Sequence, residues 1–151
     1  EKGKPEETDV TALVTEIVEE IVPRTFHVDM FDLPVMFAER LKLEQVFTNL
    51  ISNAVKYTQQ EEGYIIVSAK ELPDCYEFSV KDNGIGIDPE YHEKIFEIFQ
   101  TLREKNEKES TGIGLAIIKK IIEDQHCTIR VNSTPGAGSE FIFTWPRINI
   151  I

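Results

Sequence analysis

The sequence has few cysteines, few basic residues and no long apolar run. Its two cysteines, Cys75 and Cys127, lie far apart in the chain, which argues against a disulfide framework or a zinc site. Its 16 basic residues are outnumbered by 27 acidic ones. Because affinity for nucleic acids rests largely on clustered Lys and Arg, we expect no nucleic-acid partner. No apolar run approaches the roughly 18 residues that span a bilayer, so we expect no membrane contact.

Length and composition fit a single folded domain. Of the 151 residues, 41% are hydrophobic and 28% charged, which is ordinary for a soluble protein with one core. The polar, proline-containing start reads as a linker at residues 1–7, followed by a domain at 8–147 and a short tail at 148–151. We therefore expect a cytoplasmic fragment of a longer parent protein, which is either soluble or anchored in a membrane.

Hydrophobic periodicity predicts three long helices and six strands. The helices are expected at residues 10–21, 39–57 and 113–125, and the strands at 25–30, 35–38, 64–70, 76–81, 128–132 and 140–144. A short helical patch is expected within 91–99. Helices and strands do not alternate strictly, so the predicted class is α+β: a two-layer sandwich in which the helices cover one face of a mixed, mainly antiparallel sheet.

Six of the eight glycines form three Gly-x-Gly pairs, which are Gly84/Gly86, Gly112/Gly114 and Gly136/Gly138. Glycine suits backbone that needs a positive φ or a close approach. The middle pair precedes a predicted helix, whose unpaired N–H groups suit a phosphate, although an ordinary helix cap explains it equally well. The last pair fits a plain hairpin turn. A dinucleotide-binding GxGxxG motif is excluded because its third glycine is missing, and a P-loop because no Gly-Lys-Ser/Thr occurs.

The predicted helix at 39–57 carries a polar stripe beside its apolar one, made of Gln45, Asn49, Ser52, Asn53 and Lys56. Asn is unfavourable inside helices, yet two occur here one turn apart. One interpretation is a solvated face, although such a face more often uses Glu and Lys. The other is a binding face, on which Asn49 and Asn53 direct amide oxygens at a ligand or a hard cation and Lys56 meets phosphate.

Asp82 ends a predicted apolar strand and opens the run Asp82-Asn83-Gly84-Ile85-Gly86-Ile87. An acid in this position either shapes the turn or, if it is buried and faces a pocket, accepts a hydrogen bond from an exocyclic amine. Such a charge-assisted bond is worth roughly 1.5 to 3 kcal/mol. Both interpretations stay open.

In their order, these motifs resemble the histidine-kinase branch of the GHKL ATPase superfamily over about residues 8–146. Residues 43–57 resemble the N box, 82–86 the first glycine box, 95–99 the F box, 111–115 the second glycine box and 135–139 the closing glycine motif. The resemblance implies an ATP-binding catalytic domain of the Bergerat type, with a mobile lid at about 88–111. Two positions depart from the family pattern: Ser110 replaces a frequent glycine, and His126-Cys127-Thr128 replaces a frequent His-Gly-Gly.

The resemblance also assigns roles to individual residues. It implies that Asn53 binds Mg²⁺, that Asn49 and Lys56 face the phosphates in a catalytic role, and that Tyr57 packs against adenine. Asp82 would read the adenine amino group, supported through water by Ser139. The implied nucleotide-binding set is Asn49, Asn53, Lys56, Tyr57, Asp82, Gly84, Gly86, Ile87, Phe99, Thr111, Gly112, Ile113, Gly114, Leu115 and Ser139.

The implied activity is that of a protein histidine kinase. The domain would pass the γ-phosphate of ATP to a histidine on a separate dimerisation and phosphoacceptor domain of the same parent, from which a response regulator takes it. On its own the domain is expected to be monomeric. ATP-hydrolysing members of the superfamily carry, where this chain has Asn49, a Glu that acts as the general base for water. Water activation is therefore disfavoured here, and Glu44 remains a possible but distant base. The alternatives are a non-transferring ATP/ADP-sensing module and an anti-sigma-type protein serine kinase.

The three histidines do not supply the phosphoacceptor that such a kinase needs. Family acceptors follow the pattern His-Glu/Asp with a nearby Pro, and only His92-Glu93 begins like it. No Pro follows within the short distance expected. We therefore interpret His27, His92 and His126 as structural or surface residues.

Overall fold

The computed structural model describes residues 3–58, 62–97 and 111–148; for residues 111–113 it describes the backbone alone. In chain order the elements are β1 (Glu6–Asp9), α1 (Val10–Ile21), β2 (His27–Phe31), β3 (Val35–Ala38), α2 (Arg40–Lys56), β4 (Tyr64–Glu71), β5 (Cys75–Asp82), the 3-10 turns η1 (Pro89–Tyr91) and η2 (Lys94–Phe96), α4 (Thr111–Glu123), β6 (Ile129–Ser133) and β7 (Ser139–Pro146). A five-stranded sheet has the order β2-β4-β5-β7-β6, and β1 pairs with β3 in a separate two-stranded sheet.

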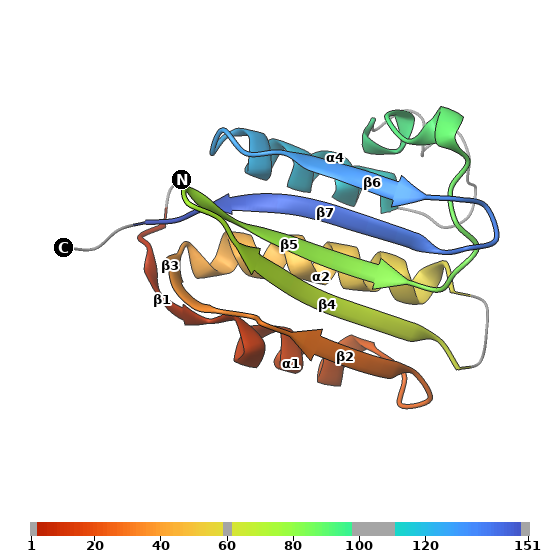
Figure 1. The fold of residues 1–151 in the computed structure, drawn as a ribbon, viewed down its shortest axis with the longest axis horizontal. Coiled ribbons are helices and arrows are strands. Elements are labelled where there is room, and N and C mark those ends of the chain that lie inside the picture. The colour runs from red at the N-terminus through yellow and green to blue at the C-terminus, as the bar shows by residue number, and fades with distance from the viewer. Residues whose placement is uncertain (1–2, 59–61, 98–110, 149–151) are drawn as a thin grey trace.

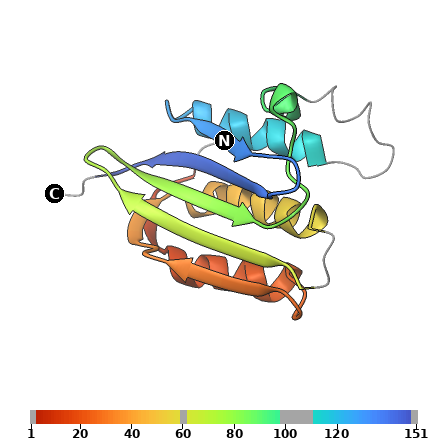
Figure 2. The same ribbon diagram turned by 45° about the vertical axis from the view of Figure 1, so that its right-hand side comes forward.

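The molecule has two layers. Helices α1, α2 and α4 lie side by side behind the five-stranded sheet in Figure 1, and Figure 2 shows the same arrangement from a second angle. Strands β2 and β4 are parallel, whereas β4, β5, β7 and β6 pair antiparallel in sequence across the sheet. The predicted α+β sandwich, with a mixed, mainly antiparallel sheet and helices on one face, is therefore confirmed.

Aromatic side chains fill the space between α2 and the middle of the sheet. Phe47 of α2 packs edge-on against Phe78 of β5 and Phe143 of β7, each with ring centroids 5.4 Å apart. Phe78 and Phe143 stack at 5.3 Å on neighbouring strands. Phe47, Phe78 and Phe143 are fully buried. Because buried aromatics contribute both apolar area and a defined ring geometry, this cluster fixes α2 across β5 and β7.

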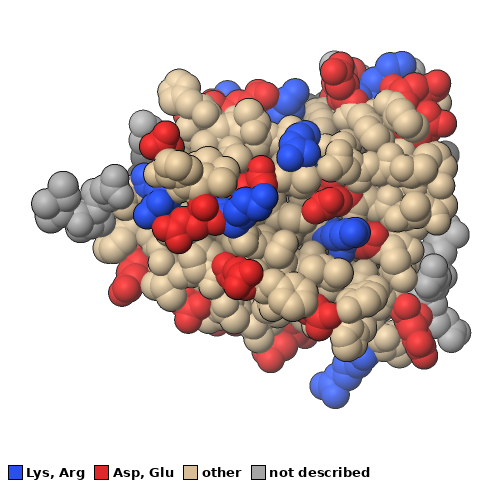
Figure 3. Space-filling view, viewed as in Figure 1, with Lys and Arg blue, Asp and Glu red and all other residues tan. Residues whose placement is uncertain are grey.

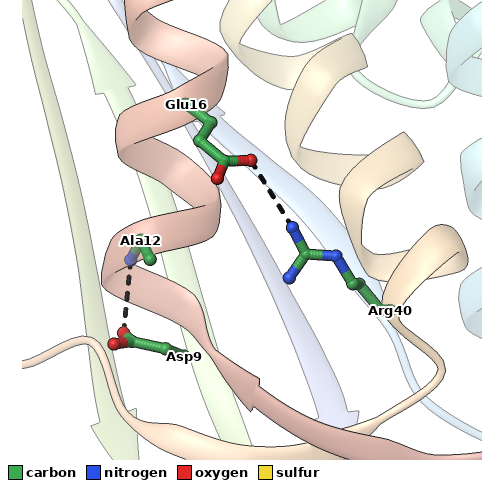
Figure 4. Close-up of polar contacts among 4 residues, drawn as sticks. All are labelled: Asp9, Ala12, Glu16 and Arg40. Carbon is green, nitrogen blue, oxygen red and sulfur yellow. Dashed lines mark hydrogen bonds and ion pairs between the residues drawn. The ribbon is translucent and has the colours of Figure 1, made fainter.

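Helix α1 is fixed by a cap and by an ion pair, both drawn in Figure 4. Asp9 is the N-cap residue, and its Oδ1 accepts a hydrogen bond from the backbone N–H of Ala12 at 3.2 Å. This satisfies one of the N–H groups that a helix start leaves unpaired. Glu16 of α1 pairs with Arg40, the first residue of α2, at 3.5 Å between Oε1 and Nη2. The exposed pair contributes little energy but joins the two helices.

The outer face of the sheet is polar. In Figure 3, which shows this face, Lys and Arg side chains are interspersed with Asp and Glu, without a broad basic patch among the described residues. Arg130 and Glu77 form an ion pair at 3.8 Å, and the Ser79 hydroxyl donates to Glu140 at 2.6 Å. Alternation along the strands sends their apolar side chains to the helical layer. Among the described residues, no helix is long and apolar enough to cross a membrane.

The strands near the N-terminus differ most from the sequence prediction. Residues 6–9 were not predicted as a strand, yet they form β1 and pair with β3 from Glu6↔Ala38 to Asp9↔Val35. The predicted strand at 35–38 matches β3, and the one predicted at 25–30 lies at His27–Phe31 as β2. The two strands belong to different sheets. A strand pattern in the sequence gives the face of each residue and not the partner strand, which explains the difference.

The turn after α4 is made without glycine. His126 adopts a positive φ of 63°, and its N–H donates to the Glu123 carbonyl at 2.9 Å, while the Cys127 N–H donates to the Ile122 carbonyl at 3.1 Å. These two bonds form a Schellman motif, whose left-handed position usually holds glycine. His126 therefore adopts the left-handed conformation usually held by glycine, at a moderate conformational cost. Cys127 and Cys75 are both free thiols.

Candidate functional site

Four segments that are distant in sequence meet at one end of the molecule, on the right of Figures 1 and 2. They are the carboxyl end of α2, the carboxyl end of β5, the first turn of α4 and the turn between β6 and β7. Most of the described residues that the sequence analysis singled out lie on these segments. Strand ends and helix ends leave polar backbone groups available, which makes such an edge of a sheet suitable for ligand binding.

Asp82 is the buried acid of this end. It is 8% exposed, ends β5, and pairs in the sheet with Ile65 on one side and Ser139 on the other. Its Oδ1 accepts hydrogen bonds from the backbone N–H of Gly84 at 2.8 Å and from that of Ser139 at 3.3 Å. Its Oδ2 accepts no hydrogen bond from the described part of the chain. The carboxylate is thus held on one oxygen and left available on the other.

Burial raises the pKa of Asp82 above the ordinary carboxyl value, and the hydrogen bonds from the Gly84 and Ser139 backbones lower it in part. The net shift is upward because desolvation penalises the charged form more than two neutral donors stabilise it. A buried acid with a raised pKa at a polar edge is a frequent mark of a functional site. Asp82 shapes its turn through Gly84, which confirms the first interpretation, and the binding of an exocyclic amine stays a prediction.

The loop after Asp82 is tied to two neighbouring elements. The Ile85 N–H donates to the Tyr57 carbonyl at the end of α2 at 3.2 Å, and the Gly136 N–H donates to the Ile85 carbonyl at 2.7 Å. The Ile87 N–H donates to the Ser133 hydroxyl at 2.7 Å. The backbone of Ile87 is therefore engaged within the protein. These bonds make the loop a fixed wall between α2 and the β6–β7 turn.

The glycines of this wall permit very close backbone contacts. Gly86 has φ of 80°, and a Cβ there would collide with the Thr134 carbonyl. Gly138 has φ of 85°, and a Cβ there would collide with the Asp82 carbonyl. Both positions need glycine for two reasons: the positive φ angle and the lack of room for a Cβ. A plain hairpin turn explains only part of the last glycine pair, since Gly138 also packs on the backbone of Asp82.

Ser139 and Ser133 link the wall to the sheet. Ser139 is 8% exposed, and its hydroxyl lies 3.0 Å from that of Ser133. The Ser133 hydroxyl also lies 2.8 Å from the Gly138 carbonyl, to which it donates. Ser139 thus reaches Asp82 directly through its backbone N–H, in addition to the water-mediated role that the resemblance implies. Sequence analysis missed Ser133, because nothing in its local pattern distinguishes it from an ordinary strand-end serine.

Asn49 faces the first turn of α4. Its Nδ2 donates to the Gln45 carbonyl one turn earlier at 2.9 Å, which fixes the orientation of the amide. Its Oδ1 then lies so close to Gly114 that a Cβ on Gly114 would collide with it. Residues 65 positions apart in the sequence are therefore in contact, as one binding face requires.

Asn53 and Tyr57 continue the same helix toward Asp82. Asn53 is 8% exposed, and its side chain makes no hydrogen bond with the residues that the structure describes. Tyr57 caps α2, is 40% exposed, and donates its N–H to the Asn53 carbonyl at 3.0 Å. Lys56 is exposed in the last turn of α2. Asn49 and Asn53 thus follow one another along the stripe that the sequence predicted.

Other predicted site residues lie partly or wholly outside this description. Phe99 is outside the described residues, and Thr111, Gly112 and Ile113 are described only as the first backbone turn of α4. Leu115 is 4% exposed and belongs to the hydrophobic core, so its side chain is structural. Its backbone stays a candidate for ligand contact.

The described start of the predicted lid, residues 88–97, is anchored to the body. Its short helical patch consists of η1 and η2, in place of a continuous helix. The His92 Nε2 donates to the Ile87 carbonyl at 3.0 Å. Phe96 is 8% exposed, packs edge-on against Phe141 at 6.2 Å, and lies under the Lys119 ammonium at 5.7 Å. Residues 98–110 of the predicted lid lie outside the described residues.

Comparison with known proteins gives the family. The model of histidine kinase-, DNA gyrase B- and HSP90-like ATPases matches residues 38–149. Phytochrome-like protein Cph1 of Synechocystis sp. is 43% identical over 119 residues, which are 79% of this chain and 16% of Cph1. The adaptive-response sensory kinase SasA of Trichormus variabilis is 33% identical over 149 residues, or 94% of this chain and 37% of SasA. The chain thus spans well under half of these relatives.

Solved structures agree with this assignment over nearly the whole chain. Full-length ShkA, crystallised in complex with AMPPNP, superimposes with a TM-score of 0.84 at 26% identity, covering 99% of this chain and 32% of ShkA. The catalytic domain of histidine kinase ThkA, in a nucleotide-free form, superimposes with a TM-score of 0.80 at 29% identity and covers 96% of this chain and 97% of that domain. The chain therefore belongs to the family of histidine kinase-, DNA gyrase B- and HSP90-like ATPases, with the fold of a histidine kinase catalytic domain.

Proposed function

We propose that this domain binds Mg²⁺-ATP and supplies the γ-phosphate to a histidine on a separate phosphoacceptor domain of its parent protein. The observation that carries the proposal is Asp82, a buried carboxylate whose Oδ1 is fixed by two backbone N–H groups and whose Oδ2 is available. An exocyclic amino group of a purine is a donor that suits this oxygen. The complex of ShkA with AMPPNP supports a nucleotide on this fold.

The phosphate end of the ligand would lie between α2 and α4. The first turn of α4 presents unpaired backbone N–H groups and the positive end of the helix dipole, which favour an anion. Asn49 lies against this turn at Gly114, and Lys56 lies two turns further along α2. This arrangement offsets triphosphate charge locally, which an acidic protein with a net charge of −11 requires.

The residues present fit a magnesium ion bound together with the triphosphate. Among the described residues, no cluster of three or more His, Cys, Asp or Glu side chains could hold a metal by itself. Asn53 is 8% exposed, and its amide forms no hydrogen bond with the described residues, so its oxygen can serve as a protein ligand to a hard cation that takes its other ligands from phosphate and water. When bound, the ion would neutralise charge on the phosphates.

Transfer to another acceptor is favoured over hydrolysis. The amide of Asn49 stands where water-activating members of the superfamily carry Glu, and an amide cannot accept a proton near pH 7. What remains for the protein is to position the nucleotide and to stabilise charge, as in other phosphoryl transfers. The similarity to the sensory kinase SasA supports a kinase, and the similarity to the catalytic domain of histidine kinase ThkA supports a histidine acceptor. A response regulator would then receive the phosphoryl group.

The test is a transfer experiment with γ-labelled ATP. The chain is incubated with Mg²⁺, labelled ATP and the separately produced phosphoacceptor domain of the same parent. We expect label on that domain that is acid-labile and base-stable, as phosphohistidine is. Base-labile label on serine would establish the serine-kinase alternative, and nucleotide binding without any transfer would establish the sensing module; either result would overturn the histidine-kinase proposal.

Replacing Gly114 with alanine should weaken ATP binding without unfolding the domain. Alanine favours the helix by roughly 0.5 to 1 kcal/mol over glycine, while its Cβ would push the Asn49 amide out of the position that its bond to the Gln45 carbonyl holds. We expect about a tenfold loss of affinity, with the free energy of unfolding changed by less than about 1 kcal/mol. Calorimetric titration and urea denaturation measure the two quantities.

The control for this prediction is a double-mutant cycle. If Gly114→Ala acts by displacing the amide, Asn49→Ala should reproduce the loss, and combining both should add little. Independent, additive losses would show that the alanine acts in another way.

A further inference from the structure

Thr58 carries a buried hydroxyl that has no partner among the described residues. The residue follows the C-cap of α2 directly and is 6% exposed. Its Oγ1 is inaccessible and forms no hydrogen bond within the described part of the chain. Its backbone N–H, in contrast, donates to the Val55 carbonyl at 3.4 Å. Buried hydroxyls are nearly always paired, because an unpaired one costs stability, so this group calls for a function.

The unpaired hydroxyl lies beside Asp82. The position that a Cβ would take on Gly84 is 3.0 Å from Thr58 Oγ1 and also 3.0 Å from Asp82 Oδ1. The two oxygens therefore border the same point and lie within about 6 Å of each other. Glycine at position 84 places no side chain between them, although the Tyr57 carbonyl oxygen borders the same point more closely than either oxygen does.

The carboxylate is held unevenly. The bond to Asp82 Oδ1 from the Gly84 N–H is 2.8 Å long, whereas the bond from the Ser139 N–H is 3.3 Å long and near the limit for such contacts. The longer bond is the weaker of the two. Turning the Asp82 carboxylate away from Ser139 and toward Thr58 would therefore cost little hydrogen-bond energy.

We propose that Thr58 is a positioning residue for the purine: its hydroxyl donates to Oδ1 of Asp82 when Oδ2 accepts the purine amino group. The proposal rests on the function proposed above and names the group that orients its acceptor. This donor has no partner within the described part of the chain and would gain one with the ligand, so the bond would contribute to binding and not to folding. A neutral donor to a charged acceptor forms a stronger bond than a neutral pair.

The experiment compares Thr58→Val, which keeps the shape and removes the hydroxyl, with Thr58→Ser, which keeps the hydroxyl. For the Val variant we expect ATP affinity to fall about tenfold while the nucleotide-free protein unfolds at the same or a higher urea concentration. The Ser variant should bind within about threefold of the unaltered protein. A Val variant that binds ATP normally, or one that is merely less stable, would overturn the proposal.

A second nucleotide separates this proposal from the function on which it rests. Inosine triphosphate carries oxygen in place of the amino group, so the Val substitution should leave its affinity unchanged. Equal losses for ATP and inosine triphosphate would assign Thr58 a packing role and reject the positioning role. If the unaltered protein binds no ATP, the proposed function itself fails; if it binds ATP and the Val variant does so equally, the Thr58 proposal alone fails.

Discussion

Replacing Gly86 with alanine is expected to lower the free energy of unfolding by about 3 to 5 kcal/mol. Gly86 has φ of 80°, which costs a residue with a Cβ energy in any surroundings. In addition, the new Cβ would collide with the Thr134 carbonyl and lie 3.0 Å from Cα of Pro135. These are backbone atoms of the β6–β7 turn, which the bond from Gly136 to Ile85 fixes in place, so they cannot rotate away. Urea denaturation of the nucleotide-free domain measures the loss.

Gly136 supplies a matched control in the same turn. It has φ of 83°, but a Cβ there would have no neighbour within 4 Å in the part of the chain that the structure describes. Gly136→Ala should therefore cost only the strain of the left-handed backbone, about 1 kcal/mol. If both variants lost the same amount, the collision at Gly86 would not be the cause, and the close packing of the loop on the β6–β7 turn would have to be abandoned.

Asp82→Asn is expected to reduce ATP affinity on the order of 100-fold while leaving the free domain folded. The amide keeps one oxygen to accept from Gly84 and Ser139, as Oδ1 does at 2.8 and 3.3 Å. It presents an NH₂ group where Oδ2 would accept the purine amino group, so two donors would face each other. The loss therefore combines a missing charge-assisted bond with a new repulsion. Calorimetric titration of both proteins with ATP measures it.

The same substitution has a defined effect on pH dependence. Burial raises the pKa of Asp82, so the folded protein favours the protonated acid more than the unfolded chain does. The stability of the unaltered domain should thus fall as pH rises from the ordinary carboxyl pKa through the raised one, and Asp82→Asn should remove this fall. If ATP binding uses the carboxylate, as we propose, it should weaken as pH drops through the raised pKa.

Asp74→Asn is the control for both measurements. Asp74 is an exposed acid in the turn between β4 and β5, at the other end of the strand from Asp82. Its substitution changes the net charge equally and should leave ATP affinity unchanged. An Asp82→Asn protein that binds ATP as tightly as the Asp74→Asn protein would refute the assignment of Asp82.

The elements with strong periodicity could be predicted from the sequence, and their pairing could not. Helix α2 was predicted to within one residue at each end because its apolar positions recur at helical spacing toward the sheet. Strands β4 and β5 were expected as a hairpin, which the register from Ile65↔Asp82 to Glu71↔Tyr76 confirms. Strand β1 was missed because its sequence Glu-Glu-Thr-Asp buries only Thr8 and shows no apolar alternation.

For the site, residue types could be singled out but their environments could not. Paired asparagines in a helix and an acid at a strand end are unusual enough to attract notice. The contact of Asn49 with Gly114 and the bonds of Asp82 depend on long-range packing, which a local pattern does not encode. Ser133 and Thr58 escaped notice for the same reason, since a hydroxyl becomes informative only when its burial and partners are known.

The bond from the Ile85 N–H to the Tyr57 carbonyl has a mechanical consequence. It ties the loop that we propose to read the base to the end of the helix that carries Asn49 and Asn53, so we expect the two sides of the proposed site to move together. If this loop holds the ring of a nucleotide, the position of the ring would then determine where the terminal phosphate lies. Accuracy in placing the terminal phosphate would come from stiffness built in before any ligand arrives.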